Sequence, residues 1–224
     1  MKSKTKNKEQ SNIGQEIAEL ETGLTELGID FDDAVLERFK TYLEILLSHR
    51  ATLHLVSHGD YERISRRHFL PSLIAFPYVK KHGRSCDVGA GAGFPSVPLK
   101  ILLPDLDLVI FEAQRKKANF LHHLISELDL SGIEIVNDRA EYYSGPGFDL
   151  VLLKAVGKID RLVRVVDTLL LPGGDAIFYK THRVGEEIER AEKKLKKRRF
   201  RFEVKKTITP VEKSPIALVI LRKL

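Results

Sequence analysis

The sequence predicts an α/β fold in which helices cover a mostly parallel sheet, preceded by a small helical region. Two observations carry this prediction. From Ser85 onward, short β-like runs alternate with helix-like stretches, and before it apolar residues recur at helical spacing. The chain has 224 residues, 43% of them hydrophobic and 30% charged, so it can bury one sizeable core.

The stretch 13–48 predicts two helices. Its apolar residues follow a helical period, and the pattern breaks at Gly28-Ile29-Asp30. Asp32 or Asp33 is placed to cap the second helix. A third helix is expected over about 60–70, ending before Pro71. We therefore expect a helical region at 13–82, after a basic and disordered tail at 1–12.

Seven strand candidates follow in the domain expected over 83–224. They are 86–88, 106–111, 133–136, 148–153, 175–179, 202–208 and 216–221. Helix candidates at 97–103, 116–128, 141–143 and 158–171 separate the first five, and another at 186–199 leads into the sixth. Only 209–215 separates the last two strands. Because that connection is too short for a parallel crossover, these two strands are predicted to form an antiparallel hairpin.

The basic excess of the chain is unevenly spread. The formal net charge is +6, yet 190–206 alone holds ten Lys and Arg against two Glu, and the first ten residues hold four Lys. The rest of the chain is net negative. Such a distribution favours a polyanionic partner, although a solvated helix face and an unstructured tail are the plainer alternatives.

Several classes of protein are excluded or disfavoured. The single cysteine, Cys86, cannot form an internal disulfide or supply a thiolate-based zinc site. No apolar run approaches the roughly 18 residues of a membrane span, and the first ten residues lack a signal-peptide core. His54 and His58 stand four apart without a third ligand nearby, so no metal site is predicted. We expect a cytoplasmic protein that does not contact a membrane.

The strongest motif is DVGAGAGFP at 87–95, which follows the first strand and opens a helix. Glycines at this position let the backbone approach a ligand at the carboxyl edge of the sheet. Glu112 ends the second strand, 19 residues after Gly93, where a carboxylate can accept hydrogen bonds from ribose hydroxyls. The spacing G-x-G-x-G disfavours a nicotinamide-dependent oxidoreductase, which needs G-x-G-x-x-G, and a Walker loop is absent.

Five segments together resemble successive motifs of the glucose-inhibited division protein B family. They are DVGAGAGFPSVPL at 87–99, EAQRKKANFL at 112–121, RAE at 139–141, FDLVLLKAV at 148–156 and LPGGDAIFYK at 171–180. Members of that family are bacterial S-adenosylmethionine-dependent methyltransferases that modify guanine N7 in small-subunit (16S) ribosomal RNA. The resemblance covers about 49–224. It implies the class I methyltransferase fold, a Rossmann-like, seven-stranded and mostly parallel sheet whose last strand runs antiparallel.

The resemblance also implies a cofactor site for S-adenosylmethionine. Glu112 and Ala113 match the ribose-binding position and its neighbour, and Ala140 and Glu141 match the pair that flanks the adenine. Lys154 stands where the family typically has arginine, and it is the candidate for a catalytic role. The loop residues of the implied cofactor site are Gly89, Ala90, Gly91, Gly93 and Phe94.

Three positions depart from the family pattern. Lys154 keeps the charge of the arginine but loses its bidentate fork, and Pro71 and Thr181 replace the family's aspartate and glycine. These departures leave an alternative open, in which the chain is a catalytically degenerate RNA-binding or ribosome-assembly protein with a methyltransferase fold.

The implied chemistry needs little from the protein beyond positioning. Guanine N7 already carries an unshared electron pair, so no general base is required, but the base must be flipped into the pocket. Lys and Arg would hold the RNA phosphates. The candidates are Arg66, Arg67, Arg115, Lys116, Arg139, Lys180, Lys193, Lys194 and Lys197. The expected partner is small-subunit ribosomal RNA or a ribosomal particle, bound by a monomer.

Overall fold

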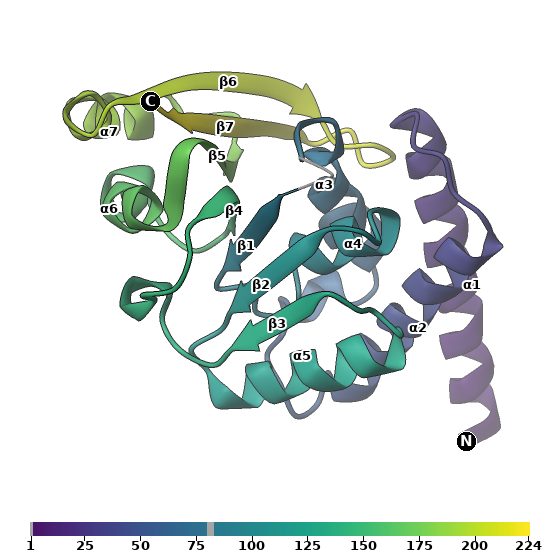
Figure 1. Cartoon of the computed structure of the whole chain (residues 1–224). Helices are drawn as coiled ribbons and strands as arrows, with labels where there is room; N and C mark the ends of the chain where they lie inside the picture. Colours follow the sequence, from purple (N-terminus) through teal and green to yellow (C-terminus); the bar gives the residue numbers. More distant parts are fainter. Residues whose placement is uncertain (1, 80–82) are drawn as a thin grey trace.

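A seven-stranded sheet forms the middle layer of the computed structural model, which describes residues 2–79 and 83–224, with side chains from Asn12 onward. The strands are β1 (Arg84–Val88), β2 (Asp107–Phe111), β3 (Ile133–Val136), β4 (Phe148–Lys154), β5 (Leu170–Thr181), β6 (Phe200–Ile208) and β7 (Pro215–Lys223). Their order is β3-β2-β1-β4-β5-β7-β6, and β7 runs antiparallel to both β5 and β6 (Figure 1). The other neighbours pair in parallel, so the predicted sheet and its terminal hairpin are confirmed.

The strand order reverses between β1 and β4. From β1 the chain passes through α4 (Ser96–Leu102) to β2 on one side, whereas β4 pairs with the other side of β1. Open α/β sheets bind their ligands at such a switch point, outside the carboxyl ends of the strands. The glycine motif follows β1 directly, so the topology places it at that point.

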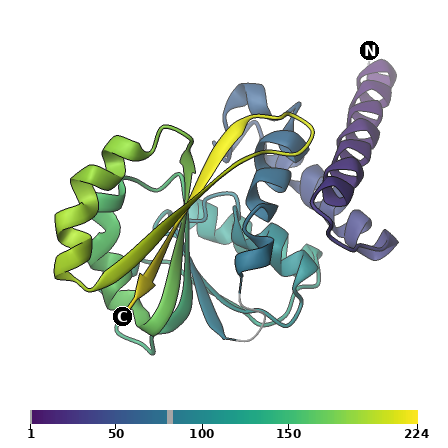
Figure 2. The same ribbon diagram turned by 90° about the horizontal axis from the view of Figure 1, so that it is seen from above.

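Two layers of helices cover the sheet, one on each face (Figure 2). The first layer holds α1 (Lys2–Glu26), α2 (Asp33–His49), α3 (Leu70–Leu73), α4 and α5 (Arg115–Glu127), and the second holds α6 (Ile159–Leu169) and α7 (Gly185–Lys197). Side chains alternate along each strand, which divides the core in two. In β2, Leu108 and Ile110 pack with the first layer, and Val109 and Phe111 pack with the second.

The two N-terminal helices meet at the predicted break. The side chain of Asp32 caps α2 by accepting a hydrogen bond from the Val35 amide, at 2.8 Å. Helix α2 then buries Phe39 and Tyr42, whose rings each lie 5.0 Å from the ring of Phe69. These aromatic contacts attach the helical region to the segment that leads into β1.

The prediction of the third helix was wrong, both in the type of helix and in where it ends. The structure has a 3-10 turn at His58–Asp60 and a π-helical turn at Ser65–Phe69, which runs directly into α3. Pro71 therefore lies inside a helix, although we expected the helix to stop before it. Pro71 comes directly after the π-helical turn, whose last backbone hydrogen bond runs from the Leu70 amide to the Ser65 carbonyl oxygen.

The division of the chain into 1–12, 13–82 and 83–224 stays a prediction. The backbone from Lys2 to Glu26 is one helix in the structure, where we expected a separate tail at 1–12. Residue 1 and the side chains of 2–11 lie outside the described part of the chain. Farther along, Leu20 and Leu24 of α1 belong to the same hydrophobic cluster as Leu150 of β4, so this helix shares the core of the sheet.

The turn between β6 and β7 reaches the N-terminal helices. Lys213 Nζ lies 2.5 Å from Glu26 Oε2 of α1, and Arg67 donates to Glu212 across 2.7 Å. Val211 and Lys213 hold φ of 60° and 55°, in the left-handed region that non-glycine residues rarely adopt. The C-terminal hairpin and the N-terminal helices therefore meet beside the carboxyl end of β5.

Candidate functional site

The glycine loop after β1 combines tight packing with open space. Gly89, Gly91 and Gly93 have φ of 73°, 59° and 100°. A Cβ on Gly93 would lie 2.6 Å from Tyr42 Oη and 2.9 Å from Val97 Cγ2, whereas a Cβ on Gly91 would meet nothing within 4 Å. Gly93 is therefore required by packing against the first helical layer. Gly91 borders space that a ligand can occupy.

Glu112 closes the other side of this space. Its side chain is buried, and its Oε2 accepts from the Gly91 amide at 3.0 Å, while Oε1 accepts from the Gln114 amide at 2.8 Å. Asn137 Nδ2 donates to the Glu112 carbonyl oxygen at 2.8 Å, which joins the ends of β2 and β3. Each carboxylate oxygen keeps a free lone pair. The carboxylate can thus accept from two neighbouring hydroxyl groups of a ligand.

Asp87, at the end of β1, is fully buried beside the loop. Its Oδ2 accepts from the Ser96 amide at 3.2 Å, whereas Oδ1 has no hydrogen-bond partner among residues 2–79 and 83–224. Burial raises the pKa of this carboxyl to about 7. An unsatisfied buried acceptor at this position suits a ligand that carries donors or a positive charge. The sequence showed Asp87 as part of the motif, but we did not predict it as a site residue.

The third part of the edge is the 3-10 turn Ala140–Tyr142 after β3. Ala140 is buried, while Glu141 is exposed and the ring of Tyr142 is 72% exposed. Ala113 is exposed after β2. The predicted cofactor residues on β1, β2 and β3 therefore gather at one edge of the sheet. Open space at Gly91, the acceptors of Glu112 and the orphaned oxygen of Asp87 fit S-adenosylmethionine, which has vicinal ribose hydroxyls and cationic groups.

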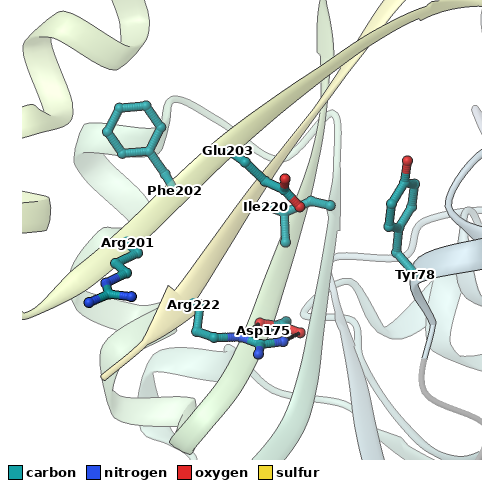
Figure 3. A pocket seen from close by; sticks show the side chains of 7 residues that line it. All are labelled: Tyr78, Asp175, Arg201, Phe202, Glu203, Ile220 and Arg222. Atoms are coloured by element: carbon teal, nitrogen blue, oxygen red, sulfur yellow. Dashed lines mark hydrogen bonds and ion pairs between the residues drawn. The ribbon is translucent and has the colours of Figure 1, made fainter.

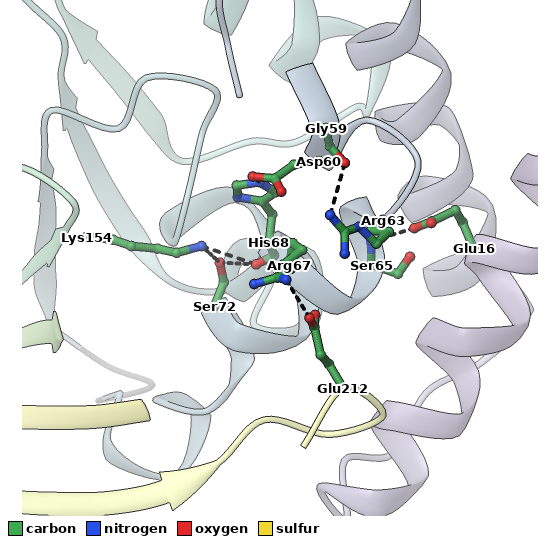
Figure 4. A network of polar contacts seen from close by, with 10 residues as sticks. All are labelled: Glu16, Gly59, Asp60, Arg63, Ser65, Arg67, His68, Ser72, Lys154 and Glu212. Atoms are coloured by element: carbon green, nitrogen blue, oxygen red, sulfur yellow. Dashed lines mark hydrogen bonds and ion pairs between the residues drawn. The ribbon is translucent and has the colours of Figure 1, made fainter. Parts of the chain in front are cut away.

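Lys154, at the end of β4, turns toward the N-terminal helices (Figure 4). Its Nζ donates to Ser72 Oγ at 3.0 Å and to the His68 carbonyl oxygen at 3.3 Å, and it lies 4.8 Å from the centre of the Phe94 ring. Burial lowers the pKa of the amine to about 7. Lys154 thus joins the glycine loop to the π-helical turn and α3, a contact that the sequence did not reveal.

His68 completes this contact. Its ring stacks on Phe94 with centroids 4.9 Å apart, and its Nε2 lies 3.2 Å from Asp60 Oδ2. Burial and the nearby charge of Lys154 lower the pKa of the imidazole to about 4, so the ring is neutral at physiological pH. The Phe94 side chain is held between a lysine and a histidine. Of these groups, only Phe94 and Lys154 were predicted as site residues.

A cavity of about 440 Å³ opens beside Lys154. It lies between the π-helical turn, the ends of β4 and β5, the first turn of α7 and the β6–β7 turn. Its charged lining residues are Arg66, Arg67, Lys154, Lys180, Glu187 and Glu212, with Thr181, Thr209 and Ser214 among the polar ones. Four cations against two carboxylates leave a net positive wall next to the cofactor loop.

Three of these cations are held by carboxylates. The pairs are Arg66 with Glu19, Arg67 with Glu212 at 2.7 Å, and Lys180 with Glu187 at 2.7 Å. Only one oxygen of Glu212 is used in this way, since its Oε2 has no hydrogen-bond partner within the described ranges. The pairs fix the cations around the cavity rather than leaving them mobile.

The structure separates the predicted RNA-binding residues into two groups. Arg66, Arg67 and Lys180 surround the cavity, and the exposed Arg115, Lys116 and Arg139 follow β2 and β3 at the same edge of the sheet. Lys193, Lys194 and Lys197 instead lie on α7 in the second helical layer. The sequence alone could not show this separation.

A larger cavity, of about 550 Å³, lies elsewhere on the sheet (Figure 3). It is lined by residues of β5, β6 and β7 together with Tyr78. Arg222 in its lining makes a bidentate contact with Asp175. Its Nε donates to Oδ1 at 2.7 Å, and its Nη2 donates to Oδ2 at 2.5 Å. Because Asp175 lies early in β5, this cavity faces away from the carboxyl end of the sheet.

The sheet order, the glycine loop at the switch point and the buried acid after β2 define a class I methyltransferase. The O-methyltransferase TomG from Streptomyces achromogenes, solved in complex with S-adenosylmethionine, has the same fold, with a TM-score of 0.59 and 18% identity over 89% of this chain and 93% of that one. A family model described as rRNA small subunit methyltransferase G matches residues 35–213. The chain belongs to this family.

The names of similar proteins support the same family assignment. A ribosomal RNA small subunit methyltransferase G of Staphylococcus carnosus is 36% identical over 176 residues, covering 75% of this chain and 73% of the relative. Another, of Dehalococcoides mccartyi, is 35% identical over 213 residues, covering 92% and 91%. The predicted family, fold class, methyltransferase activity and cofactor are thereby confirmed. Within the described residues, no helix combines the length and apolar character that crossing a membrane requires.

Proposed function

We propose that this enzyme transfers the methyl group of S-adenosylmethionine to N7 of a guanine in small-subunit ribosomal RNA. One observation carries the proposal: a cation-lined cavity of about 440 Å³, which we call the acceptor cavity, opens beside the glycine loop, at the same edge of the sheet. A flipped base would enter this cavity, and phosphates would meet its rim. The fold, the family and the relatives' names support the reaction class and the kind of RNA.

The proposed cofactor residues follow three strands, β1, β2 and β3. Glu112 accepts from the ribose hydroxyls, with Ala113 beside it, while Ala140 and Glu141 flank the adenine. Backbone groups at 89–94 lie along the amino-acid portion, and the Asp87 carboxylate balances its positive charge. When bound, S-adenosylmethionine supplies an electrophilic methyl group. The protein residues bind and orient, because N7 needs no base to act as a nucleophile.

Selection of guanine needs a separate explanation, since adenine also has an N7. The two purines differ at the six-membered ring, where guanine offers two adjacent donors, N1–H and the 2-amino group. We propose that Glu212, with one oxygen uncommitted, accepts from this edge, and that Lys180 or Arg66 donates to O6. Adenine presents an acceptor at N1, which a carboxylate repels.

Phosphates on either side of the target would be held by the carboxyl-edge cations. These are Arg66, Arg67, Arg115, Lys116, Arg139 and Lys180. Lys154 positions the Phe94 ring between the cofactor loop and the cavity, and its positive charge, when present, attracts the RNA. We further propose that the enzyme acts as a monomer in the cytoplasm, on ribosomal RNA or on a ribosomal particle.

The test is methylation of small-subunit ribosomal RNA by the purified chain, mapped by mass spectrometry. We expect one N7-methylguanine to appear with S-adenosylmethionine, and none when 7-deazaguanine replaces the target base. The Glu112→Ala variant serves as the inactive control. Binding of RNA and cofactor without any turnover would instead identify a catalytically degenerate binding protein, the alternative suggested by Lys154, Pro71 and Thr181.

A further inference from the structure

A third cavity, of about 450 Å³, lies between α6 and α7 in the second helical layer. Its lining is almost entirely charged. The lining residues are Asp160, Arg161, Val163, Arg164, Lys194, Lys197 and Arg198, and we call this surface the α6–α7 groove. Five cations thus face one carboxylate. Nothing in the cofactor site or in the acceptor cavity uses these residues.

Much of this positive charge is uncompensated. Lys194 Nζ donates to the Asp160 carbonyl oxygen at 2.8 Å and lies 3.8 Å from the Asp160 carboxylate, and Arg198 pairs with Asp167 at 2.5 Å. Arg161, Arg164 and Lys197 are exposed and have no ion pair within residues 12–79 and 83–224. Clustered like charges repel one another, so a groove of this kind is a natural site for a polyanion.

The cations of the groove lie on two helices that pack against the sheet. Arg161 and Arg164 are exposed and three residues apart on α6, and Lys194 and Lys197 are exposed and three apart on α7. Val163 and Leu195 of the same helices are buried in the core. Burial of the apolar residues fixes both helices against the sheet. Cations from both helices therefore line one groove, where they can contact phosphates of the same backbone.

The position of the groove is as informative as its charge. The acceptor cavity lies mainly against the π-helical turn and touches α7 through Glu187 in its first turn. The groove is lined by residues two to three turns farther along α7 and by α6, on the other face of the sheet (Figure 2). Along α7, Lys194 and Lys197 lie about 10 to 15 Å from Glu187, at 1.5 Å per helical residue, which is beyond the target base itself. A long or folded RNA can occupy both places, because a second segment then passes over α6 and α7.

An anionic membrane surface is the competing occupant, and the apolar residues disfavour it. Interfacial helices insert exposed apolar side chains next to their basic face. Among the described residues, the exposed large hydrophobic side chains include none on α6 or α7. The apolar residues Ala191 and Leu195 of α7 are turned into the core. The groove thus carries positive charge but no exposed apolar side chains that could insert into a membrane.

We propose that the α6–α7 groove is a second RNA-phosphate site, which holds a segment of the substrate other than the one that carries the target base. The choice of RNA as the polyanion rests on the proposed function. The groove makes affinity depend on RNA length. A short hairpin around the target would fill the acceptor cavity alone, whereas full-length ribosomal RNA would fill both sites.

The test compares two triple variants with equal loss of charge. The groove variant is Arg161→Gln, Arg164→Gln and Lys197→Gln. The control variant is Arg190→Gln, Lys196→Gln and Lys205→Gln, which changes cations already paired outside the groove. Thermal melting verifies that both remain folded. Dissociation constants for full-length small-subunit RNA and for a short target hairpin are measured over a salt series, with kcat and KM for methyl transfer.

For the groove variant with long RNA, we expect Kd and KM to rise at least tenfold and the salt slope to fall by about two to three phosphates. Its kcat at saturation and its affinity for the short hairpin should match the wild type. Equal losses on long and short RNA, equal losses in the control variant, or no loss at all would overturn the proposal. So would a loss of binding to phosphatidylserine vesicles without a loss on RNA. If the wild-type enzyme bound RNA but left guanine N7 unmethylated, the proposed function would fail while the comparison of variants still tested the groove.

Discussion

The cofactor half and the acceptor half of the site are built in different ways. On the cofactor side, the proposed site consists mostly of one short loop and one carboxylate from neighbouring strands, and backbone amides hold the carboxylate in place. On the acceptor side, the wall comes from the π-helical turn, two strand ends and the β6–β7 turn, joined through side chains. The first half depends on local sequence and the second on packing of distant segments.

This difference has a chemical reason. The cofactor is a small molecule of fixed shape, so a strand, a glycine turn and an acid suffice to bind it. The RNA substrate is large, and its site must be completed by surfaces beyond the sheet. In this chain the departures from the family pattern, Lys154, Pro71 and Thr181, all line that acceptor cavity. Changes to the two halves should therefore have separable effects.

The largest effect is expected from Glu112→Ala. The change removes the acceptors for both ribose hydroxyls and the hydrogen bond to the Gly91 amide, so cofactor affinity should fall about a hundredfold or more. Calorimetric titration with S-adenosylmethionine measures it. Glu203→Gln, on the exposed strand β6, is the control and should bind normally. Wild-type affinity in Glu112→Ala would contradict the placement of the ribose.

Substitutions of Gly93 and Gly91 by alanine should have different effects, the first on stability and the second on cofactor binding. Gly93→Ala places a methyl group 2.6 Å from Tyr42 Oη, so we expect the free energy of unfolding to fall by about 2–4 kcal/mol. Gly91→Ala meets no protein atom within 4 Å. Its left-handed backbone costs only about 1 kcal/mol, but its methyl group enters the ligand space.

Urea unfolding and cofactor titration separate the two outcomes. Gly91→Ala should lose affinity for S-adenosylmethionine while staying folded, and Gly93→Ala should lose stability first. If Gly91→Ala bound the cofactor as tightly as the wild type, the open space beside it would not be the cofactor site.

On the acceptor side, Glu212→Gln should weaken the selection of guanine. The wild type should lose roughly tenfold to a hundredfold in kcat/KM when inosine, which lacks the 2-amino group, replaces the target guanine. In Glu212→Gln this ratio should shrink, because an amide accepts less strongly than a carboxylate, while cofactor affinity stays unchanged. An unaltered ratio of guanine to inosine would show that another group reads the base.

The smallest effect concerns the pH dependence of stability. Burial lowers the pKa of Lys154 from 10.5 to about 7, so between these values the unfolded chain binds a proton that the folded chain does not. The free energy of unfolding should therefore rise with pH in this window, by up to about 1.4 kcal/mol per pH unit. Asp87 has the opposite sign. Its pKa is raised from 3.8 to about 7, so it lowers stability as the pH rises between those values.

Urea unfolding of Lys154→Met between pH 7 and 9 tests the lysine. The variant should lose the rise seen in the wild type between pH 7 and 9. The fall in stability that Asp87 causes occurs as the pH rises toward 7, so it does not affect this comparison. Parallel pH profiles of the two proteins would show that Lys154 keeps an ordinary pKa and that solvent reaches its amine.

Much of the architecture was predictable because it follows from local patterns. The strand 133–136 was predicted at its observed limits, and the hairpin 200–223 followed from the short connection between its strands. The third helix was not, because its π-helical turn and the acceptance of Pro71 depend on packing against α1 and α2. A helical period does not reveal such packing.

The basic run 190–206 illustrates the same limit. Its charge was plain in the sequence, and we expected it to help hold RNA beside the pocket. The structure divides its lysines between α7 and β6. Two of them, Lys194 and Lys197 of α7, line the α6–α7 groove together with Arg161 and Arg164 rather than the acceptor cavity. A linear sequence gives the amount of charge, whereas the fold gives its direction and its neighbours.

The sequence by itself determined the family, the sheet and the cofactor loop, since glycine spacing, strand periodicity and the acid after β2 are local features. Only the tertiary structure decided the acceptor side. Lys154 contacts His68 and Ser72, more than eighty residues away, and Arg67 contacts Glu212 near the end of the chain. Such contacts form because burying apolar surface brings remote segments together, and no spacing along the chain records which polar groups will then meet.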